Sequence, residues 1–251
     1  MQGCLHHLIF MNVLETLGGV MALGGKFSGQ GLDYNVDIVM CIDATGSMSP
    51  ILAEVKENAM SFYKKFIDEM EAQDPPKSVQ QLRIKVIVFR DYGCDSEPMV
   101  ESKFFTLGEG GEDEDFRNFV NRIEATGGGD GPENALEALA LAMKSDWVKT
   151  GAVRRHVIIM YTDAPALKLQ ERAGSPGYPS DMPESLAALR EWWEGQYMEN
   201  RAKRLQLFAP ADTPWSDMVD WQNTFHTPSQ AGHGCDDIDV STCIHLLVKS
   251  I

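Results

Sequence analysis

Two nearly continuous apolar runs in this sequence each lead directly into an aspartate. The run Val36–Ile42 is followed by Asp43, and the run His156–Thr162 is followed by Asp163. Short runs of this kind are typical of strands that are covered on both faces in a parallel sheet. Because ligands of such sheets bind beyond the carboxyl ends of the strands, the two aspartates indicate a candidate site at one edge of the fold.

Helical patterns alternate with these and further strands along the chain. Buried strands are also predicted at Arg83–Phe89 and Leu205–Phe208, and a short strand nearer the edge at Lys103–Thr106. Apolar residues at helical spacing predict helices over residues 50–70, 116–123, 132–143, 186–197, 215–225 and 240–251. The expected fold is an α/β fold, with a doubly wound, mainly parallel central sheet flanked by helices.

The chain length and the N-terminal composition define the expected domains. A chain of 251 residues has room for one ordinary α/β domain, which we place at residues 35–251. Residues 1–34 are expected to form an N-terminal helix or arm, with the glycine-rich stretch Gly24–Gly31 as the linker. The apolar stretch Leu8–Met21 is interrupted by Asn12 and Glu15, so neither a signal peptide nor a transmembrane helix is predicted.

Charge and cysteine content narrow the classes of partner and the compartment. The net charge is −15 and the pI is about 4.7, which argues against nucleic acid or a membrane surface as partner, since both are polyanionic. The acid excess fits a cation site or a basic protein partner, although solubility alone also explains it. The five cysteines are odd in number and Cys41 lies in an apolar run, which favours reduced thiols and a cytoplasmic location.

The strongest local motif follows the first apolar run. Asp43, Thr45 and Ser47 alternate in a turn between a predicted strand and a helix, with Ser49 as the expected N-cap and Pro50 in the first turn. One carboxylate and two hydroxyls at this spacing suit a hard cation, above all Mg²⁺, with Mn²⁺ or Ca²⁺ as alternatives. The competing interpretation is a turn held together by Asx and Ser/Thr hydrogen bonds to the backbone.

This motif resembles the metal-ion-dependent adhesion site of von Willebrand factor A (vWA) domains, where the first loop reads Asp-x-Ser-x-Ser. Thr45 keeps the hydroxyl of the first serine, and Asp163 matches the aspartate that the family has after its fourth strand. The blocks Asp-Ala-Thr-Gly-Ser-Met, Phe-Arg-Asp-Tyr-Gly, Gly-Gly-Gly-Asp-Gly-Pro-Glu and Thr-Asp-Ala-Pro-Ala are similar to a microbial branch of the family. That branch includes the vWA domains of alpha-kinases and of tellurite-resistance-type operons, which implies a role in signalling or stress response.

The middle loop departs from the wider family. The loop at residues 126–133 has no threonine at the position where the family usually has one, and Asp130 is the nearest oxygen ligand. Asp130 could contact the ion, and it could also be the N-cap of a capping box in which Glu133 reaches back. The resemblance therefore implies a metal site of Asp43, Thr45, Ser47, Asp130 and Asp163, with the role of Asp130 left open.

Two functions from different classes follow. The first is an interaction module, not an enzyme, whose bound ion takes an acidic side chain of a protein partner; the resemblance suggests a kinase, a phosphatase or an AAA⁺ ATPase. The second is a metal-dependent phosphoester hydrolase that uses the same ion as a Lewis acid. Asp130 or Asp91 could act as its base or nucleophile, but the four motif blocks contain no His or Lys. Arg90–Gly93 could also orient loops through an Arg–carboxylate bond, or be a solvated strand end.

Overall fold

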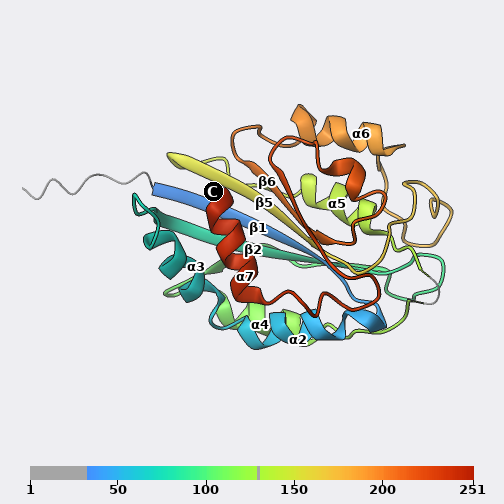
Figure 1. Ribbon diagram of the computed structural model, residues 1–251, viewed down its shortest axis with the longest axis horizontal. Coiled ribbons are helices and arrows are strands. Elements are labelled where there is room, and N and C mark those ends of the chain that lie inside the picture. The colour runs from blue at the N-terminus through green and yellow to red at the C-terminus, as the bar shows by residue number, and fades with distance from the viewer. Residues whose placement is uncertain (1–32, 129–130) are drawn as a thin grey trace, which may run out of the picture. The chain divides into compact units, whose positions relative to one another are not determined.

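The computed structural model describes residues 33–128 and 131–251, and these form one seven-stranded sheet (Figure 1). Its order is β3-β2-β1-β5-β6-β7, with β4 also paired to β2. Strands β2, β1, β5, β6 and β7 run parallel, and β3 and β4 run antiparallel to β2. The strands are β1 (Asp33–Asp43), β2 (Ser78–Phe89), β3 (Met99–Glu101), β4 (Phe105–Leu107), β5 (Val153–Tyr161), β6 (Lys203–Ala209) and β7 (Thr224–Pro228).

Helices cover both faces of this sheet, as Figure 1 shows. One layer contains α2 (Ser49–Asn58), α3 (Phe62–Glu71), α4 (Asp113–Asn121) and α7 (Val240–Ser250), and the other contains α5 (Ala135–Met143) and α6 (Leu186–Glu191). Alternate residues of β1 enter the two resulting cores, with Ile38 packed against the first layer and Val39 against the second. This arrangement confirms the predicted doubly wound, mainly parallel sheet.

The parallel strands bring their carboxyl ends to the same edge. Strand β1 ends at Asp43, and the neighbouring strand β5 ends at Tyr161, two residues before Asp163. A short 3₁₀ turn, η1 (Gly46–Met48), leads from β1 into α2. We call the loop after Asp43 the first loop, the loop at residues 126–133 the second loop and the loop that contains Asp163 the third loop. The first and third loops are therefore neighbours in space.

Several local predictions need correction. The helix predicted over residues 50–70 is two helices, because a turn at residues 59–61 separates α2 from α3. Ser49 is the first residue of α2 rather than its N-cap, and its hydroxyl donates to the carbonyl of Gly46 (2.9 Å). The edge strand predicted at Lys103–Thr106 is shifted, with β4 at Phe105–Leu107.

The segment 215–225 was predicted as a helix, and this was wrong. It contains only the 3₁₀ turn η3 (Ser216–Met218), after which Asn223 adopts a left-handed φ of 57° and the chain enters β7. Pairing with β6 overrides the helical spacing of Trp215 and Trp221, both of which are nonetheless buried. Tyr197, the last residue of the helix predicted over 186–197, follows the π-helical turn η2 (Trp192–Gln196) and is 42% exposed.

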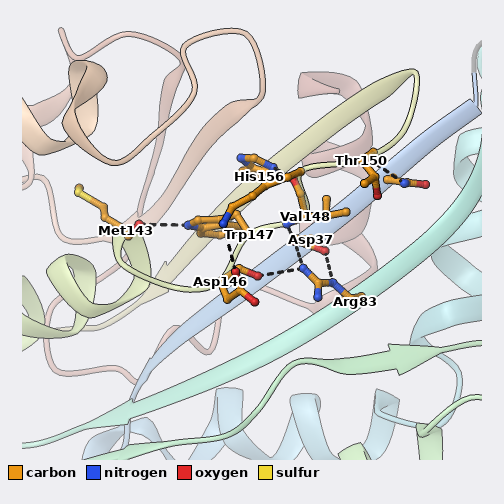
Figure 2. Close-up of polar contacts among 10 residues, drawn as sticks. Asp37, Arg83, Met143, Asp146, Trp147, Val148, Thr150 and His156 are labelled. Carbon is orange, nitrogen blue, oxygen red and sulfur yellow. Dashed lines mark hydrogen bonds and ion pairs between the residues drawn. The ribbon is translucent and has the colours of Figure 1, made fainter.

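Strand β1 also carries a buried aspartate near its start, shown in Figure 2. The Asp37 carboxylate accepts two hydrogen bonds from the guanidinium of Arg83 (2.7 and 2.5 Å) and one from the backbone N–H of Val148 (2.6 Å). The indole of Trp147 stacks on the ring of His156, with 5.1 Å between ring centroids. The Asp37–Arg83 pair holds the segment before β5 in place, through Val148 and the carbonyl of Asp146. These contacts lie away from the carboxyl end of β1, where Asp43 is.

The N-terminal prediction lies almost wholly outside the described residues, since only Asp33 and Tyr34 of the arm at 1–34 fall within them. Across the described ranges, no helix combines the length and the apolar character needed to cross a bilayer. The thiols of Cys41, Cys235 and Cys243 are buried. Burial raises the pKa of each of the three thiols, so they are protonated at neutral pH.

Candidate metal centre

Asp43 is fully buried at the end of β1 and accepts hydrogen bonds from neutral groups. Its Oδ1 accepts from the backbone N–H of Thr45 (2.9 Å) and from the Thr45 hydroxyl (2.7 Å). Its Oδ2 accepts from the hydroxyl of Thr162 (2.9 Å), at the end of the neighbouring strand. These contacts fix the carboxylate and one of the two predicted hydroxyl ligands, although none of the donors carries a positive charge.

The pKa of Asp43 reflects this environment. Burial and, less strongly, the charge of Asp163 raise it from 3.8 to about 6, against the lowering effect of the hydrogen bonds from Thr45 and Thr162. No Lys, Arg or His of the described residues forms an ion pair with Asp43 or Asp163. Neither carboxylate is therefore ion-paired by a described residue, and the nearby guanidinium of Arg90 is bonded to backbone carbonyls instead.

Asp163 and Ser47 connect the third loop to the first. The Ser47 hydroxyl donates to Oδ1 of Asp163 (3.0 Å), and Oδ2 of Asp163 accepts from the backbone N–H of Gly234 (2.7 Å). Asp163 is 3% exposed. Hydrogen bonds thus link Thr45 to Asp43 and Ser47 to Asp163, and the adjacent residues Thr162 and Asp163 join the two pairs at one edge of the sheet.

The fifth predicted residue, Asp130, lies outside the described residues. The glycines before it pack against the first loop, since the N–H of Gly46 donates to the carbonyl of Gly127 (3.3 Å). A Cβ on Gly128, where φ is 73°, would lie 2.6 Å from Cβ of Thr45. Side chains are excluded at this approach, which explains the run of glycines and brings the second loop against Thr45.

The capping box proposed for residues 130–133 was wrong. Helix α5 begins at Ala135, and its N-cap position is occupied by Asn134. Glu133 instead forms a parallel bridge with Ala166, in which its N–H donates to the carbonyl of Pro165 (3.2 Å) and its carbonyl accepts from Leu167 (2.8 Å). Glu133 thereby ties the second loop to the segment after Asp163.

Glu133 is also a site residue that the sequence analysis missed. It is 3% exposed, and Oε1 lies 3.3 Å from the position that a Cβ on Gly128 would take. That same position is in contact with Thr45, so a further carboxylate reaches the vicinity of the first loop. Because Glu133 stands directly before a predicted helix, the sequence favoured a capping role for it rather than a position near the first loop.

Arg90 orients the loops through carbonyls rather than through a carboxylate. The buried guanidinium donates to the carbonyls of Ala44 (3.2 Å), Thr126 (3.1 Å), Glu97 (2.9 Å) and Glu124 (2.7 Å). One side chain thus connects the first loop, the second loop and the β2–β3 connection. A planar guanidinium with five donors is suited to this role.

Asp91, proposed as a base for the hydrolase, is instead bound by an arginine. Its carboxylate accepts from Nε and Nη2 of Arg172 (2.9 and 2.8 Å). This pair fixes the loop after β5 to the end of β2, and it is the Arg–carboxylate bond expected for this block, with Arg172 rather than Arg90 as the donor.

A segment near the C-terminus crosses the site, and nothing in its sequence indicated this. Ser229 donates through its hydroxyl to the carbonyl of Thr162 (3.1 Å), and Gly234 contacts both Asp163 and Ser47. A Cβ on Gly234, where φ is 63°, would lie 2.1 Å from the carbonyl oxygen of Ser47. We call residues 229–235 the strap, because it packs over the first and third loops together.

Comparisons with known proteins place the fold. No family model matches the sequence. Over 151 residues, 60% of the chain, it is 25% identical to the alpha-protein kinase vwkA of Dictyostelium discoideum. Over 130 residues, 52% of the chain, it is 31% identical to an ariadne-like RING finger protein of Acanthamoeba polyphaga mimivirus. The matched parts span 22% and 11% of the lengths of these two relatives.

Solved structures resemble a larger share of the chain. The pilus adhesin SpaC from Lactobacillus rhamnosus GG matches with a TM-score of 0.53 at 10% identity, covering 87% of this chain and 31% of that one. Its open conformation matches with a TM-score of 0.51 at 11% identity. At such identities the likeness concerns the fold alone. The strand order and these matches together show a fold of the von Willebrand factor A type.

Proposed function

We propose that this chain is an interaction module that binds one divalent cation at the carboxyl edge of its sheet and docks a protein partner through it. The observation that supports this most directly is the environment of Asp43. A fully buried carboxylate, bonded to Thr45 and Thr162 and close to Asp163, lacks a counter-charge from the described residues. A bound cation would supply that charge.

The chemistry of the donor set fits a hard ion. The described residues contain no group of three His, Cys, Asp or Glu side chains that could hold a metal. The proposed site therefore combines carboxylates with the hydroxyls of Thr45 and Ser47. Thr45 and Ser47 would contact the ion directly, with Asp43, Asp130 and Asp163 bound to it directly or through water. Oxygen donors of this kind suit Mg²⁺ first, and Mn²⁺ or Ca²⁺ as alternatives.

The proposed docking follows from charge. Neutral hydroxyls leave the bound ion with uncompensated positive charge, which an acidic side chain of a partner would neutralise. The chain itself holds the loops in place through Arg90, Glu133 and the strap. The additional carboxylate of Asp130 would weaken the attraction for the partner's acid relative to a site with threonine there.

The cellular setting is part of the same proposal. We place the domain in the cytoplasm, in the microbial branch that includes alpha-kinase vWA domains, with a kinase, phosphatase or AAA⁺ ATPase as partner. The similarity to an alpha-protein kinase supports this setting. We assign no catalytic step. Asp91, the possible base, is bound to Arg172. The Cys235 thiol, which lies beside Thr162, is no ready nucleophile, because burial raises its pKa to about 12.

Calorimetric titration of Mg²⁺ and Mn²⁺ tests the metal site. Wild type should bind one ion, and Ser47→Ala should bind it about tenfold more weakly, since about 1.4 kcal/mol corresponds to a tenfold change. Ser61→Ala, which removes a hydroxyl bonded to the carbonyl of Asn58 in the α2–α3 turn, is the matched control and should bind like wild type. Equal affinity of Ser47→Ala and wild type would exclude Ser47 as a ligand.

A further inference from the structure

A cavity of about 480 Å³ opens beside the candidate metal centre, between the end of α4 and the β2–β3 connection. This volume lies within the range of pockets that bind ligand groups. Its apolar lining consists of Val88, Val100, Phe119 and Ile123. Thr126 also lines it, and the N–H of Thr126 donates to the carbonyl of Ala44 in the first loop (2.9 Å). The cavity is therefore contiguous with the second metal loop.

The polar rim of this cavity carries more acid than base. Three acids, Asp95, Glu97 and Glu124, line it together with two bases, Arg122 and Arg90. Within residues 33–128 and 131–251, the side chains of Glu97 and Glu124 form no ion pair, and the guanidinium of Arg122 donates to the backbone carbonyl of Asn118 (3.0 Å). The rim carboxylates are thus available to a cation from outside.

The rim is also held in place. Arg90 lines the cavity, and its guanidinium donates to the carbonyls of Glu97 and Glu124, as well as to those of Ala44 and Thr126. The backbones that carry the two rim glutamates are therefore fixed by the same side chain that connects the metal loops. A binding group pays less for ordering when its site is preorganised in this way.

We infer that this cavity receives an arginine side chain of the protein partner, next to the partner acid that binds the ion. The aliphatic part of arginine matches the apolar lining, its guanidinium can lie over the ring of Phe119, and its charge complements Glu97 and Glu124. This inference rests on the proposed function for the identity of the partner, whereas the pocket itself can be tested without metal. The net charge of −15 suits a basic partner segment.

The pocket is tested with N-acetyl-arginine amide as the probe. Its neutral twin, N-acetyl-citrulline amide, has nearly the same shape and is the matched control. Titrated into the full chain with labelled methyl groups, the arginine probe should shift the methyl signals of Val88, Val100 and Ile123 in the NMR spectrum. We expect it to bind about fivefold more tightly than citrulline, as one ion pair predicts. Equal shifts with both probes, or none up to tens of millimolar, would overturn the inference.

Variants of the rim separate charge from general damage to the fold. The double variant Glu97→Gln/Glu124→Gln should remove the preference for arginine over citrulline, while Arg122→Gln should increase it because a like charge is lost. Glu109→Gln/Glu114→Gln, which removes two acids outside the cavity lining, should leave the preference unchanged. A preference that falls in both rim variants contradicts the charge argument.

Short glycine–serine peptides connect the pocket to the metal. Each contains one Asp and, one to four residues away, either Arg or citrulline, and binding is measured by fluorescence anisotropy with Mg²⁺ or with chelator. We expect Arg peptides to bind more tightly in Mg²⁺ and both sets to weaken with chelator. Metal-dependent binding without an Arg preference would overturn this inference alone. An Arg preference without metal dependence would support the pocket and contradict the proposed function.

Discussion

Strand β1 contains two fully buried aspartates, and the fold treats them in opposite ways. In the first half of the strand, Asp37 accepts hydrogen bonds from Nε and Nη2 of Arg83 and from the N–H of Val148 (Figure 2). At the end of the strand, Asp43 is bound by the N–H and hydroxyl of Thr45 and by the hydroxyl of Thr162. One carboxylate therefore has its cation within the chain, and the other has hydrogen bonds without a cation.

This difference separates a structural carboxylate from a candidate ligand. A buried charge needs an opposite charge or extensive hydrogen bonding, and the ion pair at Asp37 meets that need inside the fold. Burial, together with the nearby charge of Asp163, raises the pKa of Asp43 to about 6. The carboxyl edge of β1 is thus the place where an added cation would relieve unfavourable charge, while the opposite edge has no such need.

We call the surroundings of Asp37 the compensated end of β1 and those of Asp43 the uncompensated end. The largest expected effect comes from removing the cation that is paired with Asp37. Arg83→Met leaves Asp37 buried without its cation, which should cost about 3–5 kcal/mol. At about 2–4 °C per kcal/mol for a domain of this size, the Tm should fall by about 6–20 °C. Calorimetry of the variant measures this. Asp37→Asn/Arg83→Met keeps an acceptor for Val148 without the charge and should recover most of the loss; an unchanged Tm for Arg83→Met would show that the pair contributes nothing.

The strap should be the next most sensitive element at the uncompensated end. Gly234→Ala places a Cβ 2.1 Å from the carbonyl of Ser47 at a φ of 63°, so the strap must move away from the first loop. We expect a loss of about 2 kcal/mol or more, from the left-handed backbone and the clash together. Gly232→Ala has a similar φ of 73° with open space around it, and should lose only about 1 kcal/mol. Urea unfolding compares the two, and equal losses would show that the strap does not need this close contact.

Asp43→Asn tests the comparison directly. Without metal, removing the charge should change the free energy of unfolding by less than about 1 kcal/mol, because no ion pair is lost and the remaining oxygen still accepts hydrogen bonds. With metal, the affinity for Mg²⁺ should fall by at least about tenfold, or 1.4 kcal/mol. Calorimetric titration and thermal unfolding in chelator measure both quantities. A fall in Tm of more than about 10 °C in chelator would make Asp43 a structural residue like Asp37.

The sequence predicted those parts of the fold and site that depend on neighbours along the chain. The apolar runs before Asp43 and Asp163 predicted two buried strands, and parallel strands bring their carboxyl ends together. The alternation of Asp43, Thr45 and Ser47 then indicated one turn with its oxygens grouped. These features need no knowledge of distant contacts, which is why the sheet class was confirmed.

The remaining features depend on contacts between distant segments. Asp37 lies within an apolar run and meets Arg83 only through strand pairing. Gly234 reaches Asp163 across 71 residues of sequence, and its backbone N–H leaves no pattern in the side chains. Edge pairing of β7 similarly overrides the helical spacing of residues 215–225. Local periodicity cannot report any of these contacts.

Asp130 offers a smaller test of the uncompensated end. If it binds the ion, Asp130→Thr removes a negative charge, and Mg²⁺ affinity should fall by several-fold, about 1 kcal/mol, since charge favours binding of hard cations. Stability in chelator should hardly change, because α5 begins at Ala135 and does not use Asp130 as a cap. Metal titration of the variant and wild type decides this. Equal affinities would remove Asp130 from the ligand set.

The smallest expected effect concerns Asp91, a carboxylate at the same edge as Asp43 that does have its own cation. Burial alone would raise the pKa of Asp91, but hydrogen bonds from Arg172 and Gly93 and the charge of Arg172 together lower it below 3.8. A lowered pKa in the folded state means that the stabilisation is present above the ordinary pKa and is lost as the pH falls through the folded value.

Arg172→Gln should therefore lower the free energy of unfolding at pH 6 only slightly, because the arginine is partly exposed and its charge is screened by solvent. The difference from wild type should shrink toward zero below about pH 4, as Asp91 becomes protonated in both proteins. Urea unfolding between pH 3 and 6 measures it, with Lys149→Gln, which removes a surface ion pair to Asp146, as the control. A difference that stays constant over this range would mean that Arg172 acts through packing on Gly93 rather than through the charge of Asp91. In that case, an internal cation would not be what distinguishes Asp91 from Asp43 at this edge.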